Sequence, residues 1–218
     1  MTREVQSVDA LELFRRSRRF DLIYKVELAH AWAYGTPDDI RIAEDAYLEH
    51  IRAHNAFCEK NPLRLHPFDF IRDAFRTLRS IFKEGYNPNH PIPLSSEGEL
   101  LGGAHRLAAC VAYNQRCFAC YIGKESQSVG NAFTSYLKSD IHPAVLSWGI
   151  RSYLKRVPDG RISAEFPSPL VEIPFPDLSA RPKSMRGISF PMKVRKKLFC
   201  RDYPIPGAQK PRKGFVED

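Results

Sequence analysis

Apolar and polar positions follow a helical period through most of the first 85 residues. Segment 8–18 has a partial apolar stripe, and segment 21–34 has a fuller one. The next helix has clear start signals, with Thr36 as N-cap and Pro37 at the first helical position. Two aspartates follow, where they face the positive end of the helix dipole. We therefore expect a helical lobe over residues 1–85.

Two further amphipathic stripes continue this lobe, at positions 40–58 and 68–82. His50 and His54 lie one helical turn apart, which is a spacing that metal sites use. No Glu-His motif accompanies them, so the pattern predicts a polar helix face. The basic run at 15–19 is likewise interpreted as a solvated face.

The pattern changes after residue 85, where turn residues break the helical period. Short extended stretches, a glycine pair, a small helix and an apolar strand follow one another. The extended stretch is expected at 92–94, followed by a hairpin turn and return at 95–101. The glycine pair is 102–103, the helix is expected at 107–113 and the strand at 117–122. Asn114 is a plausible left-handed helix cap. Two more helices are expected at 132–138 and 145–156.

The composition shifts again at residue 158. Ten of the seventeen prolines lie at or beyond this position, so helices and central strands are disfavoured there. Residues 181–218 hold eleven Lys or Arg and three acidic residues, which accounts for the whole formal net charge of +8. We expect an extended, proline-rich basic arm over residues 158–218, which could bind nucleic acid nonspecifically.

The overall composition is that of a folded protein without a membrane span. Hydrophobic residues make up 43% and charged residues 27% of the 218-residue chain, which argues against wholesale disorder. The sequence shows neither a long apolar run nor a signal-peptide pattern, so a cytoplasmic location is expected. The odd number of cysteines predicts reduced thiols. Cys117 and Cys120 have no second pair that would complete a zinc site, so both are expected in the core.

The segment with the clearest chemistry is Gly102-Gly103-Ala104-His105-Arg106. Glycines allow a backbone with positive φ and a close approach by a ligand. The first turn of a helix presents unpaired N–H groups and a partial positive charge, which attract anions. Arg106 can add a bidentate contact to phosphate oxygens, and His105 can donate a hydrogen bond. The segment therefore predicts a phosphate-binding turn.

The stretch from Ile92 to Ala109, with Gly-x-His-Arg at positions 103–106, resembles the signature of the ParB/sulfiredoxin-like superfamily. The resemblance implies an α+β fold with a small mixed-sheet nucleotide-binding core at 86–157, after the helical lobe. Members of that superfamily bind CTP and DNA, repair over-oxidised cysteine with ATP, or phosphorylate small hydroxyl compounds. It also implies that Gly102, Gly103, Ala104, His105 and Arg106 contact the nucleotide phosphates.

Two positions depart from the family pattern. Ala104 stands where sulfiredoxins carry their nucleophilic cysteine, and alanine offers no nucleophile, so we do not expect that chemistry. Gly102 stands where many phosphotransferase-like relatives carry Asp, so a carboxylate for Mg²⁺ or for the attacking hydroxyl must come from elsewhere. The candidate catalytic residues are Glu97 and Glu99 on the hairpin, His105 in the turn, and three helical acids, Glu27, Asp69 and Asp73, the last being one turn beyond Asp69.

The sequence thus predicts a phosphotransferase that uses ATP or another nucleotide with Mg²⁺. Its expected acceptor is a small hydroxylated compound such as a sugar or an amino acid, and no dedicated protein metal site is expected. Two alternatives stay open: a non-catalytic nucleotide-binding regulator, and a ParB-like nucleic-acid-associated protein. The second would need a helix-turn-helix module after the core, which the proline-rich segment does not offer.

Overall fold

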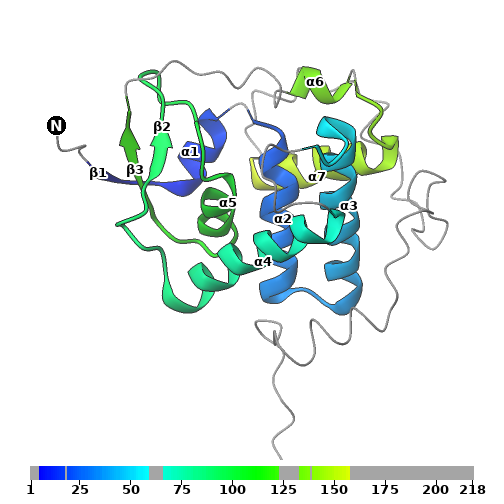
Figure 1. Cartoon of the computed structure of the whole chain (residues 1–218), viewed down its shortest axis with the longest axis horizontal. Coiled ribbons are helices and arrows are strands. Elements are labelled where there is room, and N and C mark those ends of the chain that lie inside the picture. The colour runs from blue at the N-terminus through cyan, green and yellow to red at the C-terminus, as the bar shows by residue number, and fades with distance from the viewer. Residues whose placement is uncertain (1–4, 18, 59–65, 123–132, 138, 158–218) are drawn as a thin grey trace, which may run out of the picture.

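The computed structural model describes most of the first 157 residues, namely 5–17, 19–58, 66–122, 133–137 and 139–157. Together they form a mixed α+β fold, with seven helices and a three-stranded sheet within these residues. Figure 1 shows the sheet on one side of the molecule and the long helices on the other. The expected basic arm at 158–218 lies outside the described residues and stays a prediction.

The sheet is small and mixed. Its strands are β1 (Val5–Val8), β2 (Ile92–Leu94) and β3 (Cys117–Tyr121), with β3 in the centre. β1 runs antiparallel to β3, and β2 runs parallel to it. Cys117 and Cys120 are buried in β3, as predicted.

The strand β1 corrects the sequence prediction, which began a helix at Val8. The helix α1 (Ala10–Arg16) starts two residues later and is capped by Asp9, whose side chain accepts from the backbone N–H of Glu12 at 2.8 Å. Most of β1 is exposed, so its sequence lacks the alternation that marks a half-buried strand. Its stability comes from the ladder with β3, which no local pattern reveals.

Three long helices form most of the lobe: α2 (Asp21–Tyr34), α3 (Pro37–Asn55) and α4 (Pro67–Glu84). Thr36 caps α3 as predicted, with Asp39 N–H donating to Thr36 Oγ1 at 3.3 Å and Thr36 N–H donating to Asp39 Oδ2 at 2.8 Å. α2 is buried on nearly every side because it packs against α3, α5 and α7. It is therefore the central helix of the fold.

The predicted order of hairpin, glycine turn, helix and strand is confirmed. After β2 the chain reverses through Ser95, whose N–H donates to the Glu99 carbonyl at 2.8 Å, and Leu100 then pairs with Leu94. The helix α5 (Ala104–Ala112) follows the glycine pair and lies between the sheet and α2 (Figure 1). Two further helices, α6 (Phe133–Leu137) and α7 (Pro143–Arg156), complete the described chain.

One hydrophobic cluster joins the expected lobe at 1–85 and the expected core at 86–157. It includes Leu28 and Leu78 from the first segment and Leu107 and Ile150 from the second. Because α5 is buried in this cluster, the position of each of its ends relative to the neighbouring helices is fixed. None of the helices in the described part of the chain has both the length and the apolar character needed to cross a bilayer.

Candidate functional site

Glycine suits the two positions of the turn for different structural reasons. Gly103 lies in the left-handed region, with φ of 75°, which side chains rarely adopt. A Cβ there would also lie 3.0 Å from Nη2 of Arg106. Gly102 allows a close approach to β2, since a Cβ would lie 3.3 Å from Cγ of Pro93. A larger residue at Gly103 would therefore fill the turn.

The N-terminus of α5 differs from those of most other helices in the fold. The N-cap side chains of α1, α3, α4 and α7 each accept a hydrogen bond from a backbone N–H of the first turn; these are Asp9, Thr36, His66 and His142. Gly103 has no side chain to do this. No side chain therefore caps the first amides of α5, which are the kind of donors that bind an anion.

His105 is oriented by the helical lobe. Its Nε2 lies 2.9 Å from the hydroxyl oxygen of Tyr47, which projects from α3 and is 1% exposed. When Nδ1 carries the imidazole hydrogen, Tyr47 donates this bond to Nε2. The contact fixes the imidazole relative to the start of α5.

Arg106 lies across the turn and ties it to the loop before β2. Its Nη1 donates to the carbonyl oxygens of His90 and Pro91, the latter at 3.1 Å. Its Nε and Nη2 lie over Gly103. The guanidinium also borders an open hollow of about 780 Å³ at the C-terminal end of α4. Two carbonyls thus hold Arg106 in place while other donors stay near the turn.

Behind Tyr47, His50 is buried rather than placed on a polar face as predicted. It is 3% exposed, and its ring stacks on Tyr24 of α2 with centroids 4.9 Å apart. The prediction was wrong because α2 packs against this face of α3, whereas His54 one turn later is exposed. Burial lowers the pKa of His50 well below its usual value, and the nearby charge of Lys25 lowers it further. His50 is therefore neutral at pH 7.

A buried ionic cluster lies beside His50 at the start of α2. Arg19 holds the carboxylate of Asp21 with two hydrogen bonds, at 3.0 Å from Nε and 2.8 Å from Nη2, and Lys25 donates to the same carboxylate. Burial alone would raise the pKa of Asp21, but Lys25 and Arg19 hold it well below its usual range. Asp21 therefore stays ionised and positions two cations.

This ionic cluster is the part of the site that sequence reasoning missed. Arg19 was assigned to a solvated basic run, but its side chain is only 14% exposed. The available signal was Asp21 and Lys25 at i and i+4 within an otherwise apolar helix. Such a pair in a buried helix indicates an internal ion pair.

The two hairpin acids lie just before the turn in the chain. Glu97 is exposed and Glu99 is half-buried. Their backbone N–H groups both donate to Oγ of Ser95, at 3.2 Å and 3.0 Å. Their backbone groups are thus held in the hairpin that leads into the turn.

The helical acids are engaged elsewhere. Asp69 closes the N-terminus of α4, where Oδ2 accepts from His66 N–H at 2.9 Å and Oδ1 pairs with Arg72 at 2.7 Å. Asp73 faces Arg72 and Arg76 at 4.0 Å and 3.9 Å. Glu27 pairs with Arg156 at 2.6 Å in a groove whose lining includes no residue of the turn. Each of these three acids is thus paired with an arginine.

The donors around the turn are of the kind that bind anions. Within the described residues, no three His, Cys, Asp or Glu side chains gather as metal ligands. Mg²⁺ prefers oxygen ligands and often takes several of them from phosphate and water. The first-turn amides of α5, which no side chain caps, and the Arg106 guanidinium, which lies against Gly103, are the features that suit a phosphate group.

Comparisons with known proteins do not indicate a function for this chain. No protein-family model matches the chain, and comparisons with curated proteins and with solved structures gave no match.

Proposed function

We propose that this chain is a nucleotide-dependent phosphotransferase that binds nucleotide phosphates at residues 102–106. The observation that carries the proposal is the uncapped N-terminus of α5 behind the left-handed Gly103. ATP or another nucleotide would be the donor, with Mg²⁺, and a small hydroxylated compound such as a sugar or an amino acid would be the acceptor. The reducing cytoplasm is the compartment that we propose for this activity.

The turn and its supports would divide the work of binding. Backbone N–H groups of residues 104–106 donate to phosphate oxygens, and the helix dipole favours the negative charge. His105, held by Tyr47, adds a side-chain donor, and Arg106 adds positive charge. Phosphoryl transfer depends mainly on such positioning and charge neutralisation.

The carboxylates of the hairpin are the best candidates to orient the acceptor or to hold Mg²⁺. Glu97 and Glu99 form no ion pair with another described residue, whereas Asp69 and Glu27 are paired with arginines. The cluster of Arg19, Asp21 and Lys25 lies beside His50, and burial, Lys25 and His105 all lower the pKa of this histidine. The positive charge of the cluster would stabilise the phosphates from the lobe side.

The engagement of Asp69 and Glu27 also supports the second candidate, a non-catalytic nucleotide-binding regulator. It would use the same turn but would not release a product. The ParB-like alternative depends on residues 158–218, which lie outside the described part of the chain.

A thermal-shift screen tests binding first. ATP, ADP, CTP and GTP would be added with and without Mg²⁺ to the natural protein and to His105→Ala. A ligand at a hundred times its Kd adds about 2.7 kcal/mol of stability. That amount corresponds to a rise in Tm of roughly 5–10 °C for a chain of this size. Stabilisation of the natural protein, much reduced in the variant, supports the phosphate turn; no stabilisation by any nucleotide overturns it.

A product assay then separates the two candidates. The stabilising nucleotide would be incubated with panels of sugars and hydroxy amino acids, and release of the nucleoside diphosphate would be followed. Acceptor-dependent release that falls at least tenfold in Glu99→Gln or Glu97→Gln supports the phosphotransferase. Binding without release in any panel supports the regulator.

A further inference from the structure

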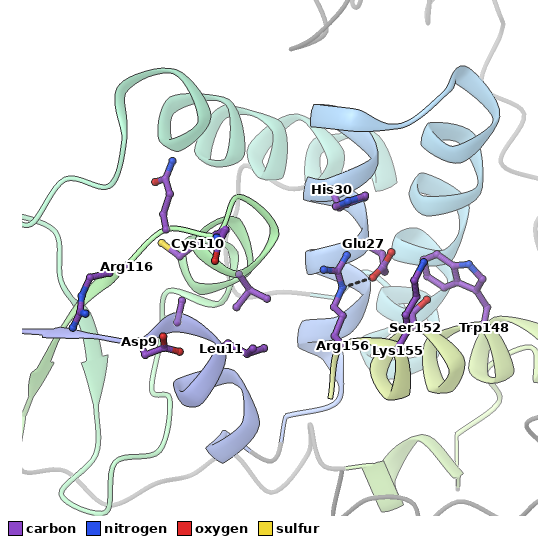
Figure 2. Close-up of a pocket in the computed structure, with 14 residues that line it drawn as sticks. Asp9, Leu11, Glu27, His30, Cys110, Arg116, Trp148, Ser152, Lys155 and Arg156 are labelled. Atoms are coloured by element: carbon purple, nitrogen blue, oxygen red, sulfur yellow. Dashed lines mark hydrogen bonds and ion pairs between the residues drawn. The ribbon is translucent and has the colours of Figure 1, made fainter. Parts of the chain in front are cut away.

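A second candidate site lies at the opposite end of α5. A groove of about 560 Å³ runs between α1 and α5 on one side and α2 and α7 on the other (Figure 2). This volume falls in the range of pockets that bind small organic ligands, about 300–1,000 Å³. None of its lining residues belongs to the turn at 102–106.

The wall formed by α2 and α7 is basic. Arg156 reaches from α7 to Glu27 on α2, with Nε 2.6 Å from Oε1, so the only carboxylate of this wall is neutralised (Figure 2). Lys155 lies next to this pair, is exposed, and makes no ion pair with any described residue. This wall therefore carries an excess of positive charge.

The pKa of His30 reflects the positive charge of this wall. His30 lines the same wall, and its partial burial lowers its pKa below the usual value; Arg156 lowers the pKa further, Glu27 opposes this, and Lys155 adds a smaller lowering. A neutral imidazole at pH 7 can donate one hydrogen bond without adding charge. An anion that binds beside it would favour its protonated form.

The opposite wall is closer to neutral. The carboxylate of Asp9 caps α1, and Arg116 donates from Nε to Oγ of Ser7 at 2.9 Å, so both charged groups are held in place at that end. Leu11 of α1 and Val111 of α5 supply apolar surface on this wall. The last carbonyls of α5 are satisfied by the chain itself, since Gln115 N–H donates to the Cys110 carbonyl at 2.8 Å.

We propose that this groove binds a small organic anion, with its carboxylate or phosphate group against Lys155, Arg156 and His30 and its apolar part against Leu11 and Val111. The three basic groups come from two helices whose relative position the core fixes, so the site is formed before a ligand arrives. The inference stands apart from the proposed function because it uses no residue of the phosphate turn.

An NMR titration tests the site directly. The imidazole signal of His30, assigned with His30→Asn, would be followed during addition of phenyl phosphate, benzoate or neutral benzyl alcohol. The two anions distinguish a phosphate from a carboxylate ligand, and the alcohol tests whether charge is required. We expect saturable shifts for at least one anion with millimolar or tighter Kd, about −4 kcal/mol or better. We also expect a higher pKa of His30 when the anion is bound.

Two lysine variants make the result specific. In Lys155→Gln we expect the anion to bind at least threefold more weakly and the pKa of His30 in the free protein to rise. Lys83→Gln removes an exposed lysine from α4, away from the groove, and should change neither. Equal binding of benzyl alcohol, no saturable shift with either anion, or equal losses in the two variants would each overturn the proposal.

Discussion

The two ends of α5 differ in how their backbone groups are satisfied. At the C-terminal end Asn114 adopts a left-handed conformation, with φ of 53°, and Asn114 N–H and Gln115 N–H donate to the carbonyls of Val111 and Cys110. These two hydrogen bonds satisfy carbonyl groups at the end of the helix from within the chain. At the N-terminal end Gly103 provides no cap. The helix is thus closed by its own chain at one end and uncapped at the other, where we propose that the backbone binds phosphate.

The charge at each end comes from a different source. At the N-terminal end it belongs to backbone amides, to Arg106 and to the buried cluster around Asp21. At the C-terminal end it belongs to Lys155 and Arg156 on a neighbouring helix. Substitutions can therefore alter one end while leaving the other intact, and four of them are ordered below from the largest expected effect to the smallest.

Asp21→Asn should have the largest effect, because it leaves Arg19 and Lys25 buried without their shared carboxylate. Breaking a buried ion pair on one side costs about 3–5 kcal/mol. Urea denaturation of the variant and the natural protein measures this loss of unfolding free energy. A loss below about 1 kcal/mol, the value of a surface pair, would contradict the role assigned to the cluster.

The same carboxylate predicts acid sensitivity. The pKa of Asp21 is depressed in the folded state, while an unfolded Asp titrates near pH 3.9. Its contribution to stability is therefore complete above roughly pH 5 and is lost as the pH falls below this. Unfolding free energy measured from pH 7 to pH 3 should fall less steeply in Asp21→Asn than in the natural protein.

Gly103→Val should come second. A β-branched residue at φ of 75° is strained, which costs about 1–3 kcal/mol, and its side chain would displace Arg106. We expect a lower Tm and a loss of nucleotide stabilisation, both read in a thermal-shift assay. Gly102→Ala is the matched control, since its Cβ meets only Pro93, and it should keep most of the binding. Undiminished nucleotide stabilisation in Gly103→Val would argue against the turn.

Tyr47→Phe should have a moderate effect on binding and little effect on the fold. It removes the hydroxyl that holds His105, and a hydrogen bond of this kind contributes about 0.5–1.5 kcal/mol. Isothermal titration calorimetry should show a nucleotide Kd that is about two- to tenfold higher. Tyr113→Phe removes a hydroxyl that bonds the Leu78 carbonyl near the other end of α5, so its Kd should be unchanged.

Asn114→Gly should give the smallest change, and in the opposite direction. Glycine adopts the left-handed conformation with less strain than asparagine, so the variant should gain about 0.5 kcal/mol of unfolding free energy. Denaturation measures the gain, and nucleotide binding should not change. A loss of binding in this variant would show that the two ends of α5 are coupled.

The sequence predicted the elements whose signals are local. The boundaries of α2 and the start of α3 followed from an apolar stripe, a glycine stop and the Thr36 cap. The turn at Gly103 followed from conformational freedom that glycine alone supplies. Each of these depends on residues within one helical turn, which a single sequence displays.

What the sequence could not predict depends on distant partners. β1 exists because it pairs with β3, and His50 is buried because α2 covers it. Asp69 looked like a free acid but completes a helix cap, which becomes visible only when the N-terminus of α4 is located. The sequence therefore predicted the backbone turn of the candidate site, but not the buried charges near it.

The pairing of β1 with β3 also sets the order in which the chain can fold during synthesis. Val5 lies opposite Cys120, so the first strand leaves the ribosome more than a hundred residues before its partner. At 5–20 residues per second this delay is roughly 6–23 s. During that time the helices of the lobe can form, while the N-terminal strand waits with unpaired backbone groups. Nascent chains arrested before residue 117 should therefore be the ones that depend most on chaperones.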